Sequence, residues 1–151
     1  MRLLAAPRIL VNPSLHAVIL IRAALATPNV LFALWRNVLI TKHSIDLQWG
    51  CRIGPGLVLT HPLGVVLGGG VTIGSNVQLA HNVSIGLAHV PQPAEPLEYP
   101  TIGDDVVIYP NSVIVGGIHV GAGSVIGANS YVDQDLPPNT VFRRRPEFTL
   151  D

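Results

Sequence analysis

The stretch Val71–Gly86, VTIGSNVQLAHNVSIG, has an aliphatic residue at every sixth position and a small residue directly after each one. The aliphatic and small residues are, in order, Ile73, Gly74, Leu79, Ala80, Ile85 and Gly86. An amphipathic helix repeats every 3.6 residues and a half-buried strand every two, so neither explains a period of six. The period is typical of a solenoid of short parallel strands, in which every sixth side chain points inward and small residues allow the corners.

The same period runs through most of the chain. Its inward positions are all aliphatic: Ile53, Leu59, Leu67, Ile73, Leu79, Ile85, Ile102, Ile108, Ile114, Val120, Ile126 and Val132. The series is interrupted twice, by a step of eight from Leu59 to Leu67 and a step of seventeen from Ile85 to Ile102. Packing gives a solenoid no reason to interrupt its own ladder, and loops on rigid scaffolds carry function. We therefore expect functional residues at these two interruptions.

The repeat divides the chain into three parts. Residues 1–45 lack it and are predicted to form a helical segment with helices at about Pro13–Ala26 and Pro28–Ile40, each opened near a proline. Residues 46–137 are predicted to form an all-β solenoid with an extruded loop at about 87–100, and residues 138–151 a C-terminal tail.

Composition restricts the classes of function. The 151 residues carry a formal net charge of zero, which gives no electrostatic case for binding nucleic acid or an acidic membrane surface. Cys51 is the single cysteine, which excludes an intrachain disulfide and fits a reducing compartment. The apolar N-terminal stretch is broken by Arg22, Pro28 and Arg36, so no transmembrane segment is expected. We predict a cytoplasmic protein whose N-terminal segment allows peripheral contact with a membrane.

The first interruption contains a histidine. His61 lies in the eight-residue step, outside the ladder, and a neutral imidazole there suits a general base. Such a base needs a partner that fixes its tautomer, usually a carboxylate. Outside the extruded loop, Asp46 is the only carboxylate before residue 104, and it precedes His61 by fifteen residues. That spacing is close to one coil of about 18 residues, so we expect Asp46 on the neighbouring coil beside His61.

These motifs resemble known families. The period resembles the hexapeptide acyltransferases, which have a left-handed parallel β-helix, and the resemblance implies a homotrimer. Residues 43–68, HSIDLQWGCRIGPGLVLTHPLGVVLG, are similar to the serine acetyltransferases, in which an Asp, an IGxG and a histidine bulge occur in this order. SLHAVILIRAALA, NVSIG and SVIGANSYVDQDLPPNT resemble other parts of that family, so the resemblance covers roughly residues 13–142.

The resemblance implies an acetyl-CoA-dependent O-acetyltransferase that uses no metal. It makes His61 the base that deprotonates an acceptor hydroxyl and Asp46 the residue that orients it. The hydroxyl then attacks the thioester of acetyl-CoA directly. CoA is expected in a groove between neighbouring prisms, with contacts from Gly86, Leu87, Pro110, Ala128 and Arg143. Arg143 suits a phosphate contact, although a solvated basic tail explains it equally well.

The chain departs from the serine acetyltransferase pattern around the acceptor. Thr60 stands where the family has an Asp, and Tyr99 where it has a second histidine, which His89 in the loop is a candidate to replace. Asn12 is the nearest remnant of the family's Asp-Pro. Losing the carboxylates that pair with an α-ammonium group makes an amino-acid acceptor harder to justify. We therefore expect a sugar or other small alcohol of polysaccharide or glycoconjugate synthesis, with L-serine as the alternative.

Partners and rival classes follow from the same residues. The chain ends in FTLD, without the terminal Ile that docks the partner sulfhydrylase in that family, so no such complex is expected. A γ-carbonic-anhydrase-like zinc enzyme would use His61, His81 and His119, but the close histidine pair of that class is missing. An inactive solenoid serving as an assembly or regulatory subunit is the third class. His16 and His43 are expected to be structural.

Overall fold

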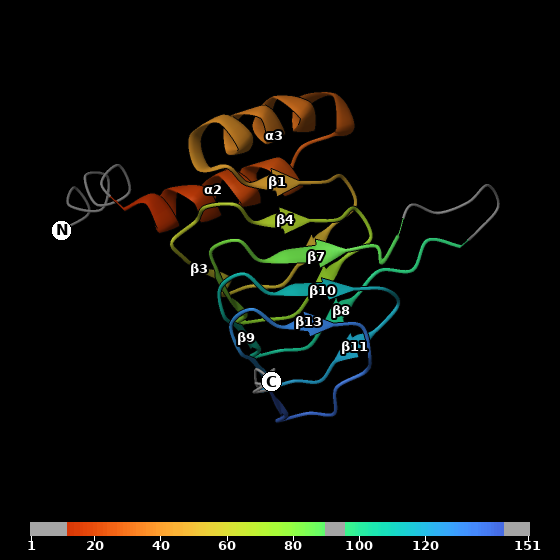
Figure 1. Cartoon of the computed structure of the whole chain (residues 1–151). Coiled ribbons are helices and arrows are strands. Elements are labelled where there is room, and N and C mark those ends of the chain that lie inside the picture. Colours follow the sequence, from red (N-terminus) through yellow and green to blue (C-terminus); the bar gives the residue numbers. More distant parts are fainter. Residues whose placement is uncertain (1–11, 90–95, 144–151) are drawn as a thin grey trace, which may run out of the picture.

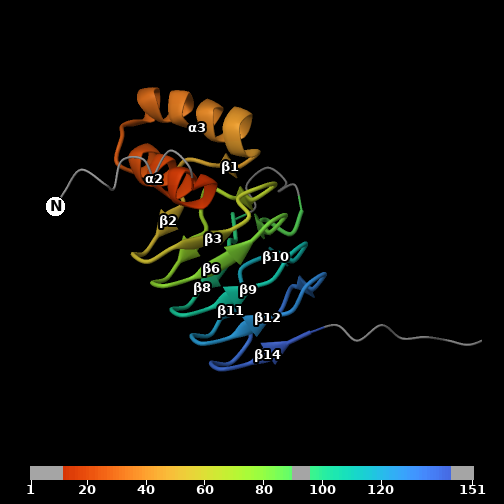
Figure 2. The same cartoon turned by 90° about the vertical axis from the view of Figure 1, so that its left-hand side faces the viewer.

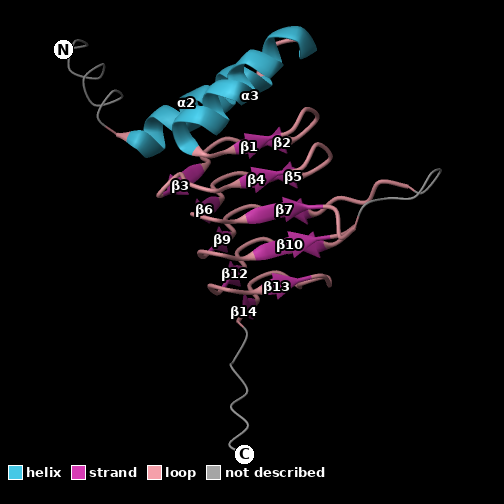
Figure 3. Ribbon diagram, turned by 45° about the horizontal axis from the view of Figure 1, so that its top comes forward, coloured by secondary structure: helices cyan, strands magenta, loops and turns pink. Residues whose placement is uncertain are grey.

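The computed structural model describes residues 12–89 and 96–143, which form a three-faced solenoid with two helices packed on one end (Figure 1, Figure 2). The chain visits the three faces in turn, and every strand pairs in parallel with strands one coil away (Figure 3). This arrangement confirms the predicted all-β solenoid with a short N-terminal helical segment.

Each face is one sheet of very short strands. The first face consists of β1 (Asp46–Leu47), β4 (Val66–Leu67), β7 (Ser84–Gly86), β10 (Val113–Val115) and β13 (Tyr131–Val132). The second face consists of β2 (Arg52–Ile53), β5 (Thr72–Ile73), β8 (Thr101–Ile102) and β11 (His119–Val120). The third face consists of β3 (Val58–Thr60), β6 (Gln78–Ala80), β9 (Val107–Ile108), β12 (Val125–Ile126) and β14 (Val141–Phe142).

The inward positions of the hexapeptide series form the core. All of them except Ile53 are buried, with exposed fractions of 2% or less, and Ile53 packs against the core from a partly buried position. Burial of one such aliphatic side chain stabilises the fold by about 1.5–3 kcal/mol. The period of six therefore reports directly which side chains fill the prism.

Asparagines line the corners between the third and first faces. Asn82, Asn111 and Asn129 adopt left-handed backbone conformations with φ of 55°, 60° and 57°. The Asn82 amide donates to Asn111 at 3.0 Å, and the Asn111 amide donates to Asn129 at 3.1 Å. Gly64 takes this place one coil above, where the Asn82 side chain leaves no room for a Cβ. Small polar side chains tolerate the left-handed region best, which explains the residue types at this edge.

Two helices cover the first coil. Helix α2 (Pro13–Leu25) is capped by Asn12, whose side chain accepts from the Leu15 N–H at 3.1 Å. Near its other end, the Arg22 guanidinium donates to the carbonyls of Ile53 and Gly54 and so fastens α2 to the solenoid. Helix α3 (Asn29–His43) extends three residues beyond the predicted end at Ile40.

The structure extends the solenoid at its C-terminal end. β14 pairs in parallel with β12, so the coil continues to Phe142, past the boundary predicted at residue 137. Residues 90–95 of the predicted loop and most of the predicted tail lie outside the described residues. Within the described part of the chain, no helix combines the length and apolar character needed to cross a bilayer.

Candidate active site

The eight-residue step forms a bulge at the corner between the third and first faces. Asp46 pairs with Val66, twenty residues later, whereas Val66 pairs with Ser84, eighteen residues later. His61 opens the bulge with an exposed side chain and a φ of 56°, in the left-handed region that few non-glycine residues adopt. The bulge is held in place because Pro62 is buried and the Leu63 N–H donates to the His61 carbonyl at 2.8 Å.

His81 lies directly against His61. Because Thr60 pairs with Ala80, the two histidines occupy equivalent positions on successive coils. Their ring centroids are 6.0 Å apart at an interplanar angle of 70°, an edge-to-face arrangement. The Nδ1 atom of His81 is buried and has no hydrogen-bond partner among the described residues. Because an unsatisfied buried nitrogen costs about 1–3 kcal/mol, a hydrogen bond to this atom would be favourable.

Asp46 is bound by an arginine that the sequence analysis did not consider. Its two carboxylate oxygens accept from Arg36 Nε at 2.7 Å and from Arg36 Nη2 at 3.0 Å. The hydrogen bond to Asp46 raises the pKa of the Arg36 guanidinium. No hydrogen bond joins Asp46 to His61, so the expected contact is absent from this structure. The reason is that α3 packs over β1 and brings Arg36 to the carboxylate first.

A pocket of about 440 Å³ lies beside His61 and is called the histidine pocket below. Its lining residues are Pro13, His16, Lys42, His43, His61, Pro62 and Leu63. His16 Nδ1 and His43 Nε2 share a hydrogen bond of 2.8 Å. Burial, together with the neighbouring His16, lowers the pKa of His43 below its usual value. The pocket therefore gathers three imidazoles and one ammonium group from α2, α3 and the bulge.

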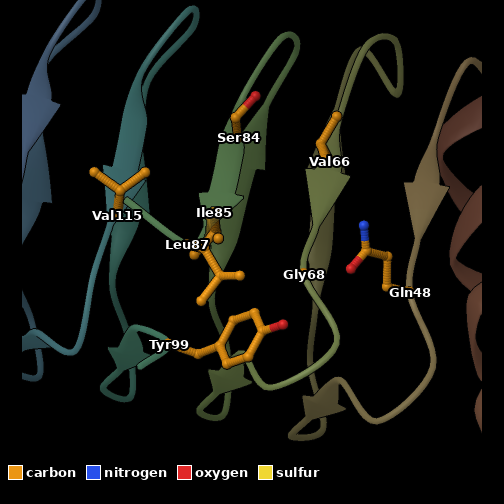
Figure 4. A pocket seen from close by; sticks show the side chains of 9 residues that line it. Gln48, Val66, Gly68, Ser84, Ile85, Leu87, Tyr99 and Val115 are labelled. Carbon is orange, nitrogen blue, oxygen red and sulfur yellow. The ribbon is translucent and has the colours of Figure 1, made fainter. Parts of the chain in front are cut away.

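A second pocket, of about 270 Å³, lies at the opposite edge of the first face and is called the tyrosine pocket below (Figure 4). It is lined by Gln48, Val66, Gly68, Ser84, Ile85, Gly86, Leu87, Tyr99 and Val115. Figure 4 shows the Tyr99 ring lying across the pocket with its hydroxyl on the side of Gln48. A Cβ on Gly70 would overlap the Tyr99 ring, so the glycines after β4 make the room that this ring occupies.

The predicted CoA contacts divide between the two edges of the first face. Gly86 and Leu87 line the tyrosine pocket. Pro110 and Ala128 instead lie in the corner column below His81, because β6, β9 and β12 pair in register. Arg143 directly follows β14, lies beside Gly127 one position before that column, and is exposed.

The residues predicted near the acceptor are not gathered in one place. The Thr60 hydroxyl lies beside His61 in sequence but accepts from Gln78 Nε2 at 3.0 Å. Tyr99 lines the tyrosine pocket, which shares no residue with the histidine pocket. His89 is exposed, just after the strand β7. A single chain therefore does not bring Tyr99 or His89 into the pocket of His61.

The remaining candidates are the zinc site of the rival class and the single cysteine. Among the described residues, no group of three or more His, Cys, Asp or Glu side chains is arranged to hold a metal ion. His119 lies on the second face, whereas His61 and His81 lie at the edge between the third and first faces. Burial raises the pKa of the Cys51 thiol to about 12, so this cysteine is an interior residue without nucleophilic character at neutral pH.

The structure and the known proteins agree on the family. The family model "Bacterial transferase hexapeptide (six repeats)" matches residues 99–134. A serine acetyltransferase of Helicobacter pylori is 33% identical over 135 residues, which make up 85% of this chain and 76% of that protein. The chain belongs to the serine acetyltransferase family. The motifs around His61 and Asp46 are thus placed in the family that they resemble.

Solved structures of the family have the same fold. The Neisseria gonorrhoeae serine acetyltransferase in complex with serine matches with a TM-score of 0.80 and 29% identity, over 96% of this chain and 61% of that one. The solenoid is therefore the left-handed β-helix of hexapeptide repeats. Coverage of the longer relatives is smaller: the chain spans 28% of a mitochondrial serine acetyltransferase of Arabidopsis thaliana, with 36% identity, and 35% of a Buchnera aphidicola relative.

Proposed function

We propose that this protein is an acetyl-CoA-dependent O-acetyltransferase in which His61 is the general base. One observation carries the proposal. In a chain of the serine acetyltransferase family, the ladder gains two residues at one corner and holds an exposed histidine there in a left-handed conformation. A backbone conformation of this kind costs about 1–3 kcal/mol and clusters at functional sites.

The proposed reaction needs only proton transfer and direct attack. A ring nitrogen of His61 takes the proton of the acceptor hydroxyl while its oxygen attacks the carbonyl carbon of the acetyl thioester. The tetrahedral intermediate collapses with cleavage of the carbon–sulfur bond. The CoA sulfur takes the proton back from the imidazolium, which leaves an acetyl ester, free CoA and a neutral His61.

In this proposal Asp46 accepts a hydrogen bond from His61 and keeps its hydrogen bonds to Arg36. An ionised carboxylate has about four acceptor positions, and Arg36 occupies two of them. In the proposed active form, an N–H of His61 would donate to one of the remaining positions. Arg36 would then hold the Asp46 carboxylate in place, and Asp46 would hold His61 in one tautomer.

The relatives support L-serine as the acceptor better than they support a sugar. The H. pylori relative is a serine acetyltransferase, and the N. gonorrhoeae protein was solved in complex with serine. L-serine is therefore the first acceptor proposed for this protein. Acetyl-CoA is the acetyl donor proposed with it.

A sugar or another small alcohol is the second candidate acceptor. The observation that favours it is the lining of the histidine pocket, in which the described residues include Lys42 and three histidines and no carboxylate. The α-ammonium group of serine would lie beside Lys42 without a carboxylate to pair with, and two like charges close together repel each other. Thr60, which stands where the family has an Asp, provides no charge to offset this cost.

A homotrimer is the proposed assembly. His61 and Tyr99 lie at opposite edges of the first face, and the predicted CoA contacts are divided in the same way. Prisms packed side by side around a threefold axis would bring the histidine pocket of one copy against the tyrosine pocket of the next. CoA would then lie in the groove between copies.

The test is the release of CoA from acetyl-CoA by the purified full chain. The acceptors are L-serine and a panel of sugars and nucleotide sugars. His61→Ala is expected to lower kcat at least a hundredfold, the usual contribution of a general base. His119→Ala on the second face serves as the matched control and is expected to keep the wild-type rate.

Each outcome of this test decides a separate part of the proposal. Turnover of L-serine supports the first acceptor, and turnover of a sugar without serine supports the second. Equal rates in wild type and His61→Ala would remove His61 as the base. No release with any acceptor, together with no binding of acetyl-CoA, would overturn the enzymatic function.

A further inference from the structure

The histidine pocket has a charge pattern that the proposed chemistry at His61 does not require. Lys42 is the only lysine of the chain, and it lines this pocket together with His16, His43 and His61. The other lining residues are two prolines and a leucine, so no acidic side chain of the described residues faces the pocket. A general base alone gains nothing from a neighbouring ammonium group, because a nearby cation disfavours the imidazolium that forms during catalysis.

Lys42 is not held by any protein partner. It is exposed, and no hydrogen bond or ion pair is recorded for it among the described residues. Asp46, the carboxylate four residues later, is bound through both oxygens to Arg36. The last turn of α3 favours a cation through the helix dipole, but the dipole does not explain why α2 brings His16 to the same pocket.

The two imidazoles at the base of the pocket form a fixed pair. His43 is only 7% exposed, and its Nε2 shares a 2.8 Å hydrogen bond with Nδ1 of His16. One proton lies between these two nitrogens, so the neutral pair keeps one N–H and one bare nitrogen for other partners. The pair can therefore donate one hydrogen bond without a full charge, next to the full charge of Lys42.

We infer that the histidine pocket binds an anionic group of the acceptor, a carboxylate or a phosphate, and so presents the acceptor hydroxyl to His61. This inference rests on the proposed function and specifies its substrate class. The pocket volume of about 440 Å³ suits a molecule of amino-acid or monosaccharide size. Lys42 supplies the charge, and the His16–His43 pair supplies one N–H donor.

The anion site distinguishes anionic from neutral acceptors, a distinction that the family relationship alone does not make. L-serine qualifies through its carboxylate, and an acidic sugar or a sugar phosphate qualifies without the penalty of an unpaired ammonium group. A neutral sugar does not qualify. Lys42 and the His16–His43 pair are thus specificity-determining residues, distinct from His61.

The first test compares acceptors that differ only in the anion. The pairs are L-serine against L-serinamide, glucuronate against glucuronamide, and galactose 1-phosphate against methyl galactoside, with CoA release as the readout. We expect kcat/KM to be about tenfold or more higher for the anionic member of at least one pair, since hydrogen bonds to charged groups are the strong ones. The carboxylate and phosphate pairs distinguish the two kinds of anion.

Two variants connect this preference to the pocket. Lys42→Gln is expected to reduce the preference for the anionic member to about threefold or less, mainly through KM. Arg52→Gln removes an equal charge from the exposed strand β2 on the second face and is expected to leave the preference unchanged. Equal kcat/KM for charged and neutral members in the wild type would overturn the inference and leave the O-acetyltransferase function standing.

A second test does not depend on turnover. Because Lys42 is the only lysine, an amine-acylating reagent followed by peptide mass spectrometry reports on the pocket at a single side chain. Glucuronate or galactose 1-phosphate, neither of which carries an amine to consume the reagent, is expected to slow acylation of Lys42, whereas their paired neutral compounds are not. If every anion leaves the acylation rate unchanged, the pocket binds no anion, even if CoA release is measured with some acceptor.

Discussion

His61 and His81 illustrate how a solenoid converts sequence register into a contact between side chains. The pairing of β3 with β6 fixes the two rings on successive coils with centroids 6.0 Å apart. In the structure the group that lies next to His61, the proposed base, is the ring of His81 and not a carboxylate group. An imidazole adds no negative charge, so His81 acts by restricting where the His61 ring can lie.

His81→Ala is expected to lower kcat about tenfold, because His61 loses the ring edge that restricts its rotamers. His81→Gln, which keeps a planar polar group, is expected to restore part of the loss. The measurement is kcat for CoA release in the two variants. A positioning role predicts partial recovery in His81→Gln, whereas a purely structural role predicts equal losses in both variants. An unchanged rate in His81→Ala would contradict the role.

His43 is expected to make stability depend on pH. Burial and the neighbouring His16 lower the pKa of His43 in the folded chain below its usual 6.5. The unfolded chain therefore binds more protons between these two values, and the free energy of unfolding falls as the pH drops below 6.5. Above that pH His43 contributes no dependence.

Urea denaturation at about pH 5 and about pH 7.5 measures this effect, because the two pH values bracket the usual pKa of histidine. His43→Phe is expected to show a smaller loss of stability between the two pH values than the wild type does. His119→Asn, an exposed histidine of β11, controls for the removal of one imidazole. An identical pH dependence in wild type and His43→Phe would contradict the assignment.

At the scale of elements, Arg22 connects the helical cap to the first coil. Its guanidinium donates to the carbonyls of Ile53 and Gly54, the last of which belongs to a corner of the solenoid. Arg22→Ala is expected to reduce the free energy of unfolding by about 1.5–3 kcal/mol, the range for hydrogen bonds to a charged group. Urea denaturation measures this change in the free energy of unfolding, and Arg52→Ala on the exposed strand β2 is the control. Equal stability of the two variants would show that α2 is held by apolar packing alone.

The sequence predicted the fold more completely than the site for a physical reason. Burial of every sixth side chain is a local rule, so the period of six identified the core positions and the bulge at His61. The ion pair between Arg36 and Asp46 depends on how α3 packs over β1, which no local period encodes. The His16–His43 pair arises in the same way from the docking of two helices. The presence of Arg36 ten residues before Asp46 was the only sequence signal of this ion pair, and spacing alone does not show a contact.

At the scale of the whole molecule, the two pockets lie on opposite edges of one face. β4 begins just after the bulge that carries His61, and Gly68, which lines the tyrosine pocket, follows directly after β4. A molecule that used both pockets on one substrate would need them close together. In the proposed trimer, the histidine pocket of one copy would meet the tyrosine pocket of the next.

This argument predicts complementation between inactive variants. His61→Ala disables the histidine pocket, and Tyr99→Ala removes the ring that lies across the tyrosine pocket. If each site combines His61 of one copy with Tyr99 of the next, a trimer that mixes the two variants contains some sites with both residues intact. Refolding an equal mixture is then expected to restore about a quarter of the wild-type CoA release, because random mixing gives each site an even chance for each residue.

Sedimentation velocity on the same samples shows whether they are trimers. As the control, each variant refolded alone is expected to remain inactive at the same protein concentration. Activity that stays at the level of the separate variants in a verified mixed trimer would place both residues in one copy's site, or Tyr99 outside the site. A monomer with full activity would contradict the shared site altogether, since one chain holds the two pockets apart.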